Sequence, residues 1–240
     1  MNYLVIGSGR MSIGIVHDLL QFGNVKRVDV ADVSQEALDK LYDHFSDERV
    51  YRHKISANDK VNLIPLMEKA DGVLSAVPYD YNFDLTSWAI ESSCHFVDLG
   101  GNNTVVDSQF SLTEDALHAK VGIIPDCGLA PGMVSGVAAH LINQFDEVDT
   151  VEIRVGGLPV DPKPPLNYML VFSVHGLINE YIEPTVILRV GKIATVESMT
   201  ETENLIFPEP FGNLEAFYTS GGTSTLPQTY QGKIKTLNYK

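Results

Sequence analysis

The sequence predicts an α/β protein: a Rossmann-type doubly wound parallel sheet, followed by a second α+β domain with a mostly antiparallel sheet. Three observations predict this fold class. In the first half, short apolar runs alternate with stretches of helical apolar spacing, which is the pattern of βαβ units. A glycine-rich turn, Gly7-Ser8-Gly9, closes the first apolar run. After about Gly128 the chain becomes rich in strand-like runs separated by Pro- and Gly-rich loops.

The expected elements follow in chain order. Apolar runs predict the strands of the first sheet at residues 3–6, 28–31, 70–77, 95–99 and 121–125. Helical spacing predicts helices at residues 11–22, 83–91 and 112–118, and a further helix that includes residues 37–41. Further on we expect a helix at residues 134–145 and strands at 150–155, 168–174, 186–190, 192–197 and 232–237. The change of composition divides the chain into two domains, residues 1–125 and 126–240.

The composition excludes several classes of protein. Of the 240 residues, 44% are hydrophobic and 20% are charged, which is ordinary for a globular chain. The 17 basic and 31 acidic residues give a net charge of −14, so we expect neither nucleic acid nor a membrane surface as a partner. Cys94 and Cys127 match no disulfide framework and no metal pair. Because the chain opens on a strand and not on a signal segment, we expect a cytoplasmic location.

The turn after the first strand has the features of a dinucleotide site. Gly7-Ser8-Gly9-Arg10-Met11-Ser12 matches the first two glycines of a GxGxxG motif, with the small Ser12 in the third place. In that motif, backbone N–H groups of the following helix bind the pyrophosphate. Asp32 ends the second strand, where its carboxylate would bind the ribose hydroxyls and repel a 2′-phosphate. The predicted cofactor is therefore NAD, with NADP less favoured; a turn without a ligand is the alternative.

Loops after the other strands are expected at the same edge of the sheet, where doubly wound folds bind ligands. The segment Ala76-Val77-Pro78 follows one strand and Leu99-Gly100 follows the next, and we expect both to flank the cofactor. Asp126 follows the last strand of the first domain. Turn formation alone explains any single loop of this composition, but three loops on one edge favour a binding site.

Seven segments lie in order along nearly the whole chain: GSGRMSIGI, SAVPYDYN, HFVDLGGNN, PDCGLAPGM, RVGGLP, VFSVHGLINEY and EAFYTSGGTSTLP. Together they resemble the saccharopine dehydrogenase-like family, most closely its lysine 6-dehydrogenase branch. The resemblance implies an oxidoreductase of amino-acid metabolism that has a Rossmann domain and a second α/β domain, uses NAD(P) and forms homodimers. For the lysine branch it implies oxidative deamination of the ε-amine of L-lysine to the semialdehyde, which cyclises to Δ1-piperideine-6-carboxylate.

Two other interpretations of the function stay open. A saccharopine or carboxynorspermidine-type reductase would form a secondary amine from an imine. Its site would have to bind a second, carboxylate-bearing arm of the substrate, which needs more cationic residues than we can place. The chain also ends at Lys240, without the C-terminal return segment that the family resemblance implies. We therefore keep, as an alternative of another class, a truncated, marginally stable and inactive NAD-binding protein.

Hydride can leave an amine carbon only when the nitrogen is uncharged, so the substrate ammonium must first lose a proton to a base. Asp126 is the preferred base because it lies on the ligand-binding edge of the sheet. His175 and Tyr79 are the further candidates for the base or for a proton relay. A structural role, as a turn cap or a packed side chain, is the alternative for each.

The substrate carboxylate needs a cation or a nest of N–H donors. The segment Thr219-Ser220-Gly221-Gly222-Thr223-Ser224 is dense in hydroxyls and flexible backbone, which suits an anion. Arg154 is the expected cation, and Tyr168 is expected to line the pocket or to relay a proton. The alternatives are a surface loop for the segment, a solvent-facing strand position for Arg154 and simple packing for Tyr168.

Overall fold

The computed structural model describes residues 1–165, 167–170 and 172–240. These residues form two compact units, unit 1 from Met1 to Cys127 and unit 2 from Gly128 to Lys240. The division falls just beyond the boundary that we placed after Pro125. Each unit has its own sheet and its own hydrophobic core.

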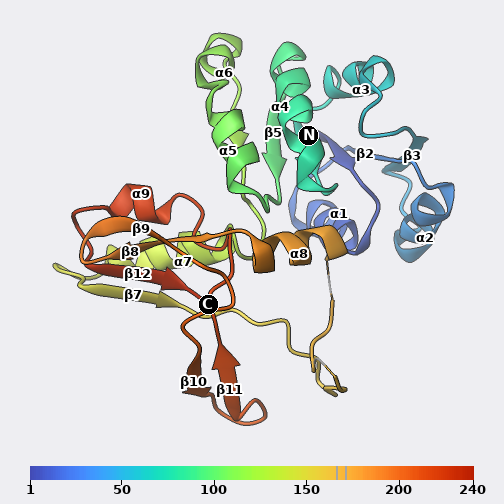
Figure 1. Cartoon of the computed structure of the whole chain (residues 1–240). Coiled ribbons are helices and arrows are strands. Elements are labelled where there is room, and N and C mark those ends of the chain that lie inside the picture. The colour runs from blue at the N-terminus through green and yellow to red at the C-terminus, as the bar shows by residue number, and fades with distance from the viewer. Residues whose placement is uncertain (166, 171) are drawn as a thin grey trace. The chain divides into compact units, whose positions relative to one another are not determined.

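Unit 1 alternates strands and helices (Figure 1). Its strands are β1 (Asn2–Ile6), β2 (Arg27–Asp32), β3 (Val50–Lys54), β4 (Gly72–Ser75), β5 (His95–Asp98) and β6 (Ile123–Ile124). Its helices are α1 (Arg10–Phe22), α2 (Gln35–Phe45), α3 (Lys60–Met67), α4 (Asn82–Glu91), α5 (Asn103–Phe110) and α6 (Thr113–Ala119), with a 3₁₀ turn at Tyr79–Tyr81. The strands pair in parallel in the order β3-β2-β1-β4-β5-β6, which confirms the doubly wound sheet.

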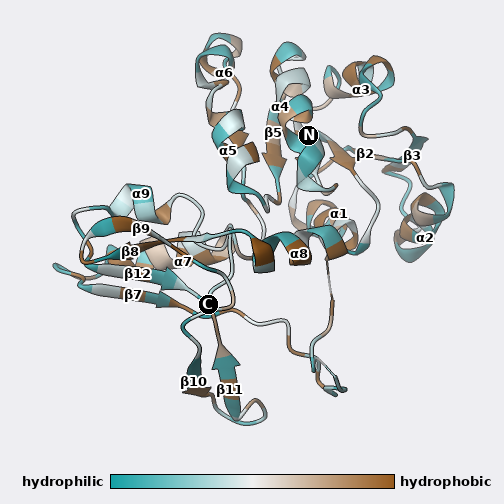
Figure 2. Cartoon of the chain, viewed as in Figure 1, coloured by the Kyte–Doolittle hydropathy of each residue, from teal (hydrophilic) through white to brown (hydrophobic). Residues whose placement is uncertain are grey.

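Both faces of this sheet are apolar, and helices cover each of them. Leu4 and Ile6 of β1 pack with Leu63 of α3 and Leu85 of α4, whereas Val5 packs with residues of α1 and α2. Successive side chains of a strand point to opposite faces, so a sheet buried on both sides is built from continuous apolar runs. Figure 2 shows such a run as the brown ribbon in the middle of β5.

Unit 2 begins with α7 (Met133–Ile142) and continues mainly as strands. A sheet in the order β7-β12-β8-β9 is formed by β7 (Thr150–Ile153), β12 (Thr236–Tyr239), β8 (Thr185–Arg189) and β9 (Lys192–Val196). Separately, β10 (Glu203–Ile206) and β11 (Asn213–Ala216) form a hairpin, and the remaining helices of the described residues are α8 (Val174–Ile182) and α9 (Leu226–Tyr230). Only the β7–β12 pair is parallel among the described strands of this unit, so the predicted α+β unit with a mostly antiparallel arrangement is confirmed.

The strand that we expected at residues 168–174 is wrong. Residues 168–170 and 172–173 form no strand, and Val174 begins α8; Val171 lies outside the described residues. Ser173 caps the helix, because its side chain accepts a hydrogen bond from the backbone N–H of Gly176 at 2.9 Å. A short apolar run is weak evidence for a strand, and here the cap at Ser173 begins a helix where the expected strand would have ended. In unit 1, β3, α3 and α5 have no counterpart among the predicted elements.

No helix within the part of the chain that the structure describes is long and apolar enough to cross a membrane. In the same residues, no group of three or more His, Cys, Asp or Glu side chains could hold a metal ion. The cytoplasmic location stays a prediction.

Candidate functional site

The glycine-rich turn joins β1 to α1 in unit 1. Gly7 has a φ of +101°, and a Cβ atom there would lie 2.8 Å from the carbonyl oxygen of Ala76, so only glycine fits. Gly9 precedes α1 without a side-chain cap, and a Cβ atom there would meet nothing within 4 Å. Space is therefore open beside the N-terminus of α1, whose backbone N–H groups attract anions.

Asp32, at the end of β2, is hydrogen-bonded to the same turn. Its Oδ2 accepts from the Ser8 N–H at 2.7 Å, and its Oδ1 accepts from the Ser34 N–H at 2.7 Å. These bonds fix the carboxylate beside the glycine turn, at the place expected for a ribose partner. Lys54 pairs with Asp32 in the β2–β3 register, so the neighbouring strand carries a cation that sequence order alone did not indicate. The turn, the helix terminus and the carboxylate together fit a dinucleotide.

The loop after β4 lies against the other side of the turn. The Ala76 N–H donates to the Ile6 carbonyl at 2.8 Å, and Val77 Cγ1 lies 3.3 Å from the position of a Cβ on Gly7. Pro78 is exposed and leads into the 3₁₀ turn that contains the half-buried Tyr79. The structure thus brings the Ala76-Val77-Pro78 loop to the glycine turn, as expected for a loop that flanks a cofactor.

Asp98 links the loops that follow β5 and β6. Its Oδ1 accepts from the N–H groups of Gly100 at 2.7 Å and Asp126 at 3.2 Å, and its carbonyl accepts from the Cys127 N–H at 2.7 Å. Burial raises the pKa of the Asp98 carboxyl above its usual value, although hydrogen bonds from Gln109 and from the two backbone groups oppose this shift. Asp126 is itself only 6% exposed. Two buried carboxyl groups therefore lie at this edge of the sheet.

A chain of buried polar side chains holds Asp98 in place. Gln109 Nε2 donates to Asp98 Oδ2 at 2.7 Å and to Thr86 Oγ1 at 2.8 Å. Thr86 donates to the Asn82 carbonyl at 2.7 Å, and Ser75 Oγ donates to Asn82 Oδ1 at 2.7 Å. The network joins the ends of β4 and β5 through α4 and α5. None of these residues was among the predicted site residues, although the place of Asp98 at a strand end was a usable signal.

In unit 2 the segment from Thr219 to Ser224 lies against α8 and β8. The Ser220 N–H donates to the Glu180 carbonyl at 2.9 Å, and Ser220 Oγ donates to the preceding carbonyl of α8 at 3.2 Å. Thr223 Oγ1 donates to a carbonyl of β8 at 3.0 Å. Two hydroxyls that we expected to meet the substrate carboxylate are therefore bonded to the backbone. The turn uses positive φ angles at Gly221 and Ser224.

Four titratable side chains gather beside this segment: Glu180 and Tyr181 of α8, Tyr168, and Tyr239 of β12. Each tyrosine interacts electrostatically with Glu180, and Tyr239 also interacts with the Thr219 hydroxyl. Burial raises the pKa of Glu180 to about 7, and burial is also the main reason that all three tyrosine pKa values are raised. We name this group the Glu180 cluster. The sequence analysis predicted a site role for Tyr168 and for the nearby Thr219, whereas Glu180 and Tyr181, which end the segment VFSVHGLINEY, were given no role.

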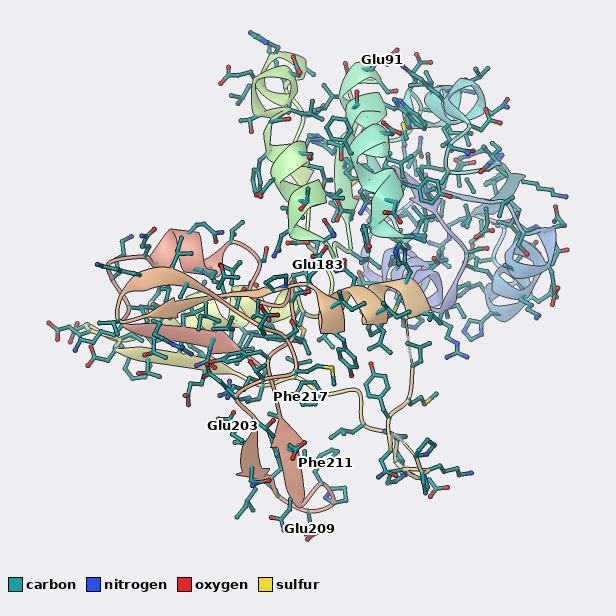
Figure 3. All side chains as sticks on the ribbon, in the orientation of Figure 1. Glu91, Glu183, Glu203, Glu209, Phe211 and Phe217 are labelled. Atoms are coloured by element: carbon teal, nitrogen blue, oxygen red, sulfur yellow. The ribbon has the colours of Figure 1, made fainter. Side chains whose placement is uncertain are left out.

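Arg154 and His175 have other surroundings in unit 2. The Arg154 guanidinium donates to the carboxylate of Glu203, labelled on β10 in Figure 3, and to Asn238 Oδ1 at 2.7 Å. Arg154, the cation that we expected to bind the substrate carboxylate, is therefore already paired with Glu203. His175 is exposed near the start of α8, and its separation from Glu180 corresponds to about 140° around the helix axis.

Two family models match this chain. The one described as saccharopine dehydrogenase NADP binding domain matches residues 3–123, and the one described as saccharopine dehydrogenase C-terminal domain matches residues 128–240. The chain belongs to the saccharopine dehydrogenase family. The family resemblance of the seven sequence segments is therefore confirmed.

Similar proteins of this saccharopine dehydrogenase family are longer than the chain. Mitochondrial alpha-aminoadipic semialdehyde synthases of Rattus norvegicus and Mus musculus are each 26% identical over 223 residues, which cover 89% of this chain and 23% of the relative. The solved apo saccharopine dehydrogenase (L-Glu forming) from Saccharomyces cerevisiae superposes with a TM-score of 0.76 at 19% identity. That match covers 99% of this chain and 54% of the yeast chain, and it shows the same fold.

Proposed function

We propose that this chain is an NAD-dependent oxidoreductase acting on the C–N bond of an amino acid, with the ε-amine of L-lysine as the leading substrate group. The observation that carries the proposal is the edge of the unit 1 sheet. There, a glycine turn that fits a dinucleotide adjoins strand-end loops holding the buried carboxyl groups of Asp98 and Asp126. The printed names of the relatives, alpha-aminoadipic semialdehyde synthase and saccharopine dehydrogenase, support a lysine-related substrate.

The turn from Gly7 to Met11 would hold the pyrophosphate, with Asp32 at the ribose and the Ala76-Val77-Pro78 and Leu99-Gly100 loops flanking the cofactor. When bound, the dinucleotide supplies the hydride acceptor. The family model is described as NADP-binding, and Lys54 lies across from Asp32. We nevertheless propose NAD, because the fixed Asp32 carboxylate would repel a 2′-phosphate directly.

Asp126 would take the proton from the substrate ammonium. The Asp126 backbone has a φ of +59°, and its N–H donates to the Asp98 carboxylate. This backbone conformation sets the direction of the Asp126 side chain, which is buried. Removal from water disfavours the charged form of a bound ammonium, which helps a neighbouring base to take its proton. The uncharged nitrogen can then assist loss of hydride from the adjacent carbon, and water converts the resulting iminium to aldehyde and ammonia.

A saccharopine-type reductase is the second candidate, and the names of the relatives favour it. The pairing of Arg154 with Glu203 leaves fewer cations in unit 2 for a substrate with an additional carboxylate. Rates of NADH formation with NAD are measured by absorbance for L-lysine, for saccharopine and for a panel of other amino acids. The comparison of these rates separates the lysine dehydrogenase from the saccharopine-type reductase. NADH from saccharopine alone would replace the lysine proposal. Tight NAD binding without turnover on any substrate would support the inactive NAD-binding protein.

A homodimer is also part of the proposal. The β10–β11 hairpin exposes Ile206 and Phe211, at 86% and 55% of their surface, and Phe211 is labelled at the hairpin end in Figure 3. Large apolar side chains exposed together suit contact with a second copy. Light scattering should give twice the chain mass for the wild type and a lower mass for Ile206→Glu.

A further inference from the structure

The carboxyl group of Asp98 accepts hydrogen bonds on both of its oxygens. Its Oδ1 accepts from the backbone N–H groups of Gly100 and Asp126, and its Oδ2 accepts from the side-chain amide of Gln109 at 2.7 Å. Because Asp98 and Gln109 are 1% and 3% exposed, water cannot readily take the place of a lost donor. The bond from Gln109 therefore fixes the orientation of the carboxyl group that holds the Asp126 loop.

A short turn and a helix bring the chain back to Asp98. After β5 the backbone turns at Gly100, which has a φ of +73°, and Asn102 then caps α5 through its side-chain oxygen. Gln109 lies in the last turn of this helix, 11 positions after Asp98. The hydrogen bond between Gln109 and Asp98 thus closes a loop that contains Gly100, one of the residues whose N–H groups Asp98 accepts.

The neighbours of Gln109 determine which way its amide group faces. Thr86 donates its hydroxyl hydrogen to the Asn82 carbonyl, so towards Gln109 its oxygen serves as an acceptor. Asp98, when ionised, is also an acceptor only. Gln109 Nε2 donates to both, at 2.8 Å to Thr86 and 2.7 Å to Asp98. Glutamine supplies two donors at this position, whereas an ionised glutamate of the same shape supplies none.

We propose that Gln109 is a positioning residue: through Asp98 it sets the loop that carries Asp126, and with it the direction of the Asp126 carboxyl group. One bond from Asp98 Oδ1 holds the Asp126 N–H. The other holds Gly100, the backbone against which Asp126 Oδ1 packs. The proposal rests on the proposed function only where Asp126 is named as the base, because the arrangement of the loop does not depend on turnover.

Gln109→Met keeps the length of the side chain and removes both donors. We expect the backbone N–H resonances of Gly100 and Asp126 to shift in ¹H–¹⁵N spectra of the full chain. With saturating cofactor, kcat on the amino-acid substrate should fall by about tenfold or more, as expected for a misplaced base. Gln21→Met makes the same change at an exposed position of α1 and should alter neither readout.

Gln109→Glu separates positioning from packing, since glutamate has the shape of glutamine. A protonated glutamate donates an O–H to Asp98, but two ionised carboxyl groups repel each other. Asp98 is the titratable group that hydrogen-bonds this position, and the other partner, Thr86, carries no charge. We therefore expect the Gly100 and Asp126 resonances to match the wild type at acidic pH and to depart from it as the pH rises. The ratio of variant to wild-type kcat should fall over the same range.

Unchanged Gly100 and Asp126 resonances in a folded Gln109→Met protein would overturn the proposal, as would a Gln109→Glu protein whose resonances keep the same relation to the wild type at every pH. Cooperative urea unfolding shows whether each variant folds, and Gln109→Glu at acidic pH carries the test if Gln109→Met does not. A wild type that turns over no amino acid would contradict the proposed function, and the resonances would then decide this proposal by themselves.

Discussion

The backbone of Gly100 lies directly against the carboxyl group of Asp126, so that a Cβ atom on Gly100 would stand 1.9 Å from Asp126 Oδ1. Gly100 also has a φ of +73°, a conformation that side chains rarely adopt. Both residues donate their backbone N–H to the same Asp98 oxygen. The two loops are therefore shaped as one unit around Asp98.

Gly100→Ala should destabilise the protein by about 3 kcal/mol, because it adds both a steric overlap and an unfavourable φ. Urea denaturation of both proteins measures the difference. Gly14→Ala is the matched control: it lies within α1, a Cβ atom there meets nothing within 4 Å, and alanine should stabilise the helix by up to about 1 kcal/mol. A tolerated Gly100→Ala would mean that the two loops are not tightly coupled.

Asp32→Ser should reduce the preference for NAD over NADP, because it removes the charge that opposes a 2′-phosphate. Titration of the wild type and the variant with each dinucleotide gives the ratio of the two affinities. Lys54→Gln serves as the control on the neighbouring strand and should weaken NADP binding more than NAD binding. Equal or tighter NADP binding by the wild type would contradict the cofactor proposal.

Asp126→Asn should lower kcat on the amino-acid substrate by about a hundredfold or more while leaving NAD affinity nearly unchanged. Asparagine tolerates the positive φ of this position, so the variant tests the base and not the turn. The rate is measured across the pH range. Unchanged turnover at every pH would assign Asp126 a structural role.

Glu180 should make the protein less stable as the pH rises from about 4.5 to about 7. The pKa of its carboxyl is raised from 4.5 to about 7 in the folded protein, so over this range the folded state binds more protons than the unfolded state and loses stability with rising pH. Glu180→Gln should remove this loss and be more stable than the wild type above that range by on the order of 2 kcal/mol. Urea denaturation across the range checks it; a parallel pH dependence in the two proteins would contradict it.

The parts of the site that the sequence predicted depend on neighbouring residues. A strand, a glycine turn and a helix follow one another within the first 22 residues, and Asp32 ends the next strand, so each signal is local. The Asp126 loop was found in the same way, from its place after a strand. Parallel strands then bring these loops to one edge without any need to know the side-chain contacts.

The parts that the sequence did not predict depend on contacts between distant residues. Glu180 becomes notable only because it is partly buried and interacts electrostatically with Tyr168 and Tyr239, and no spacing rule joins these residues. Arg154 is paired by Glu203, 49 positions further on, so the sequence could not show that its charge is neutralised. The strand predicted at residues 168–174 is absent from the described residues of that range, and the helix that begins at Val174 was not predicted, because periodicity over so few residues is ambiguous.

Ser12 occupies the third place of the glycine motif, is fully buried, and donates its hydroxyl hydrogen to the Gly7 carbonyl at 2.8 Å. The side chain thus ties the end of β1 to the first turn of α1, where a glycine would only leave room. The serine that departs from the motif therefore stabilises the loop through its own hydrogen bond. A search pattern that requires glycine at this position would therefore miss this glycine-rich turn, in which a serine hydrogen bond takes the place of the glycine.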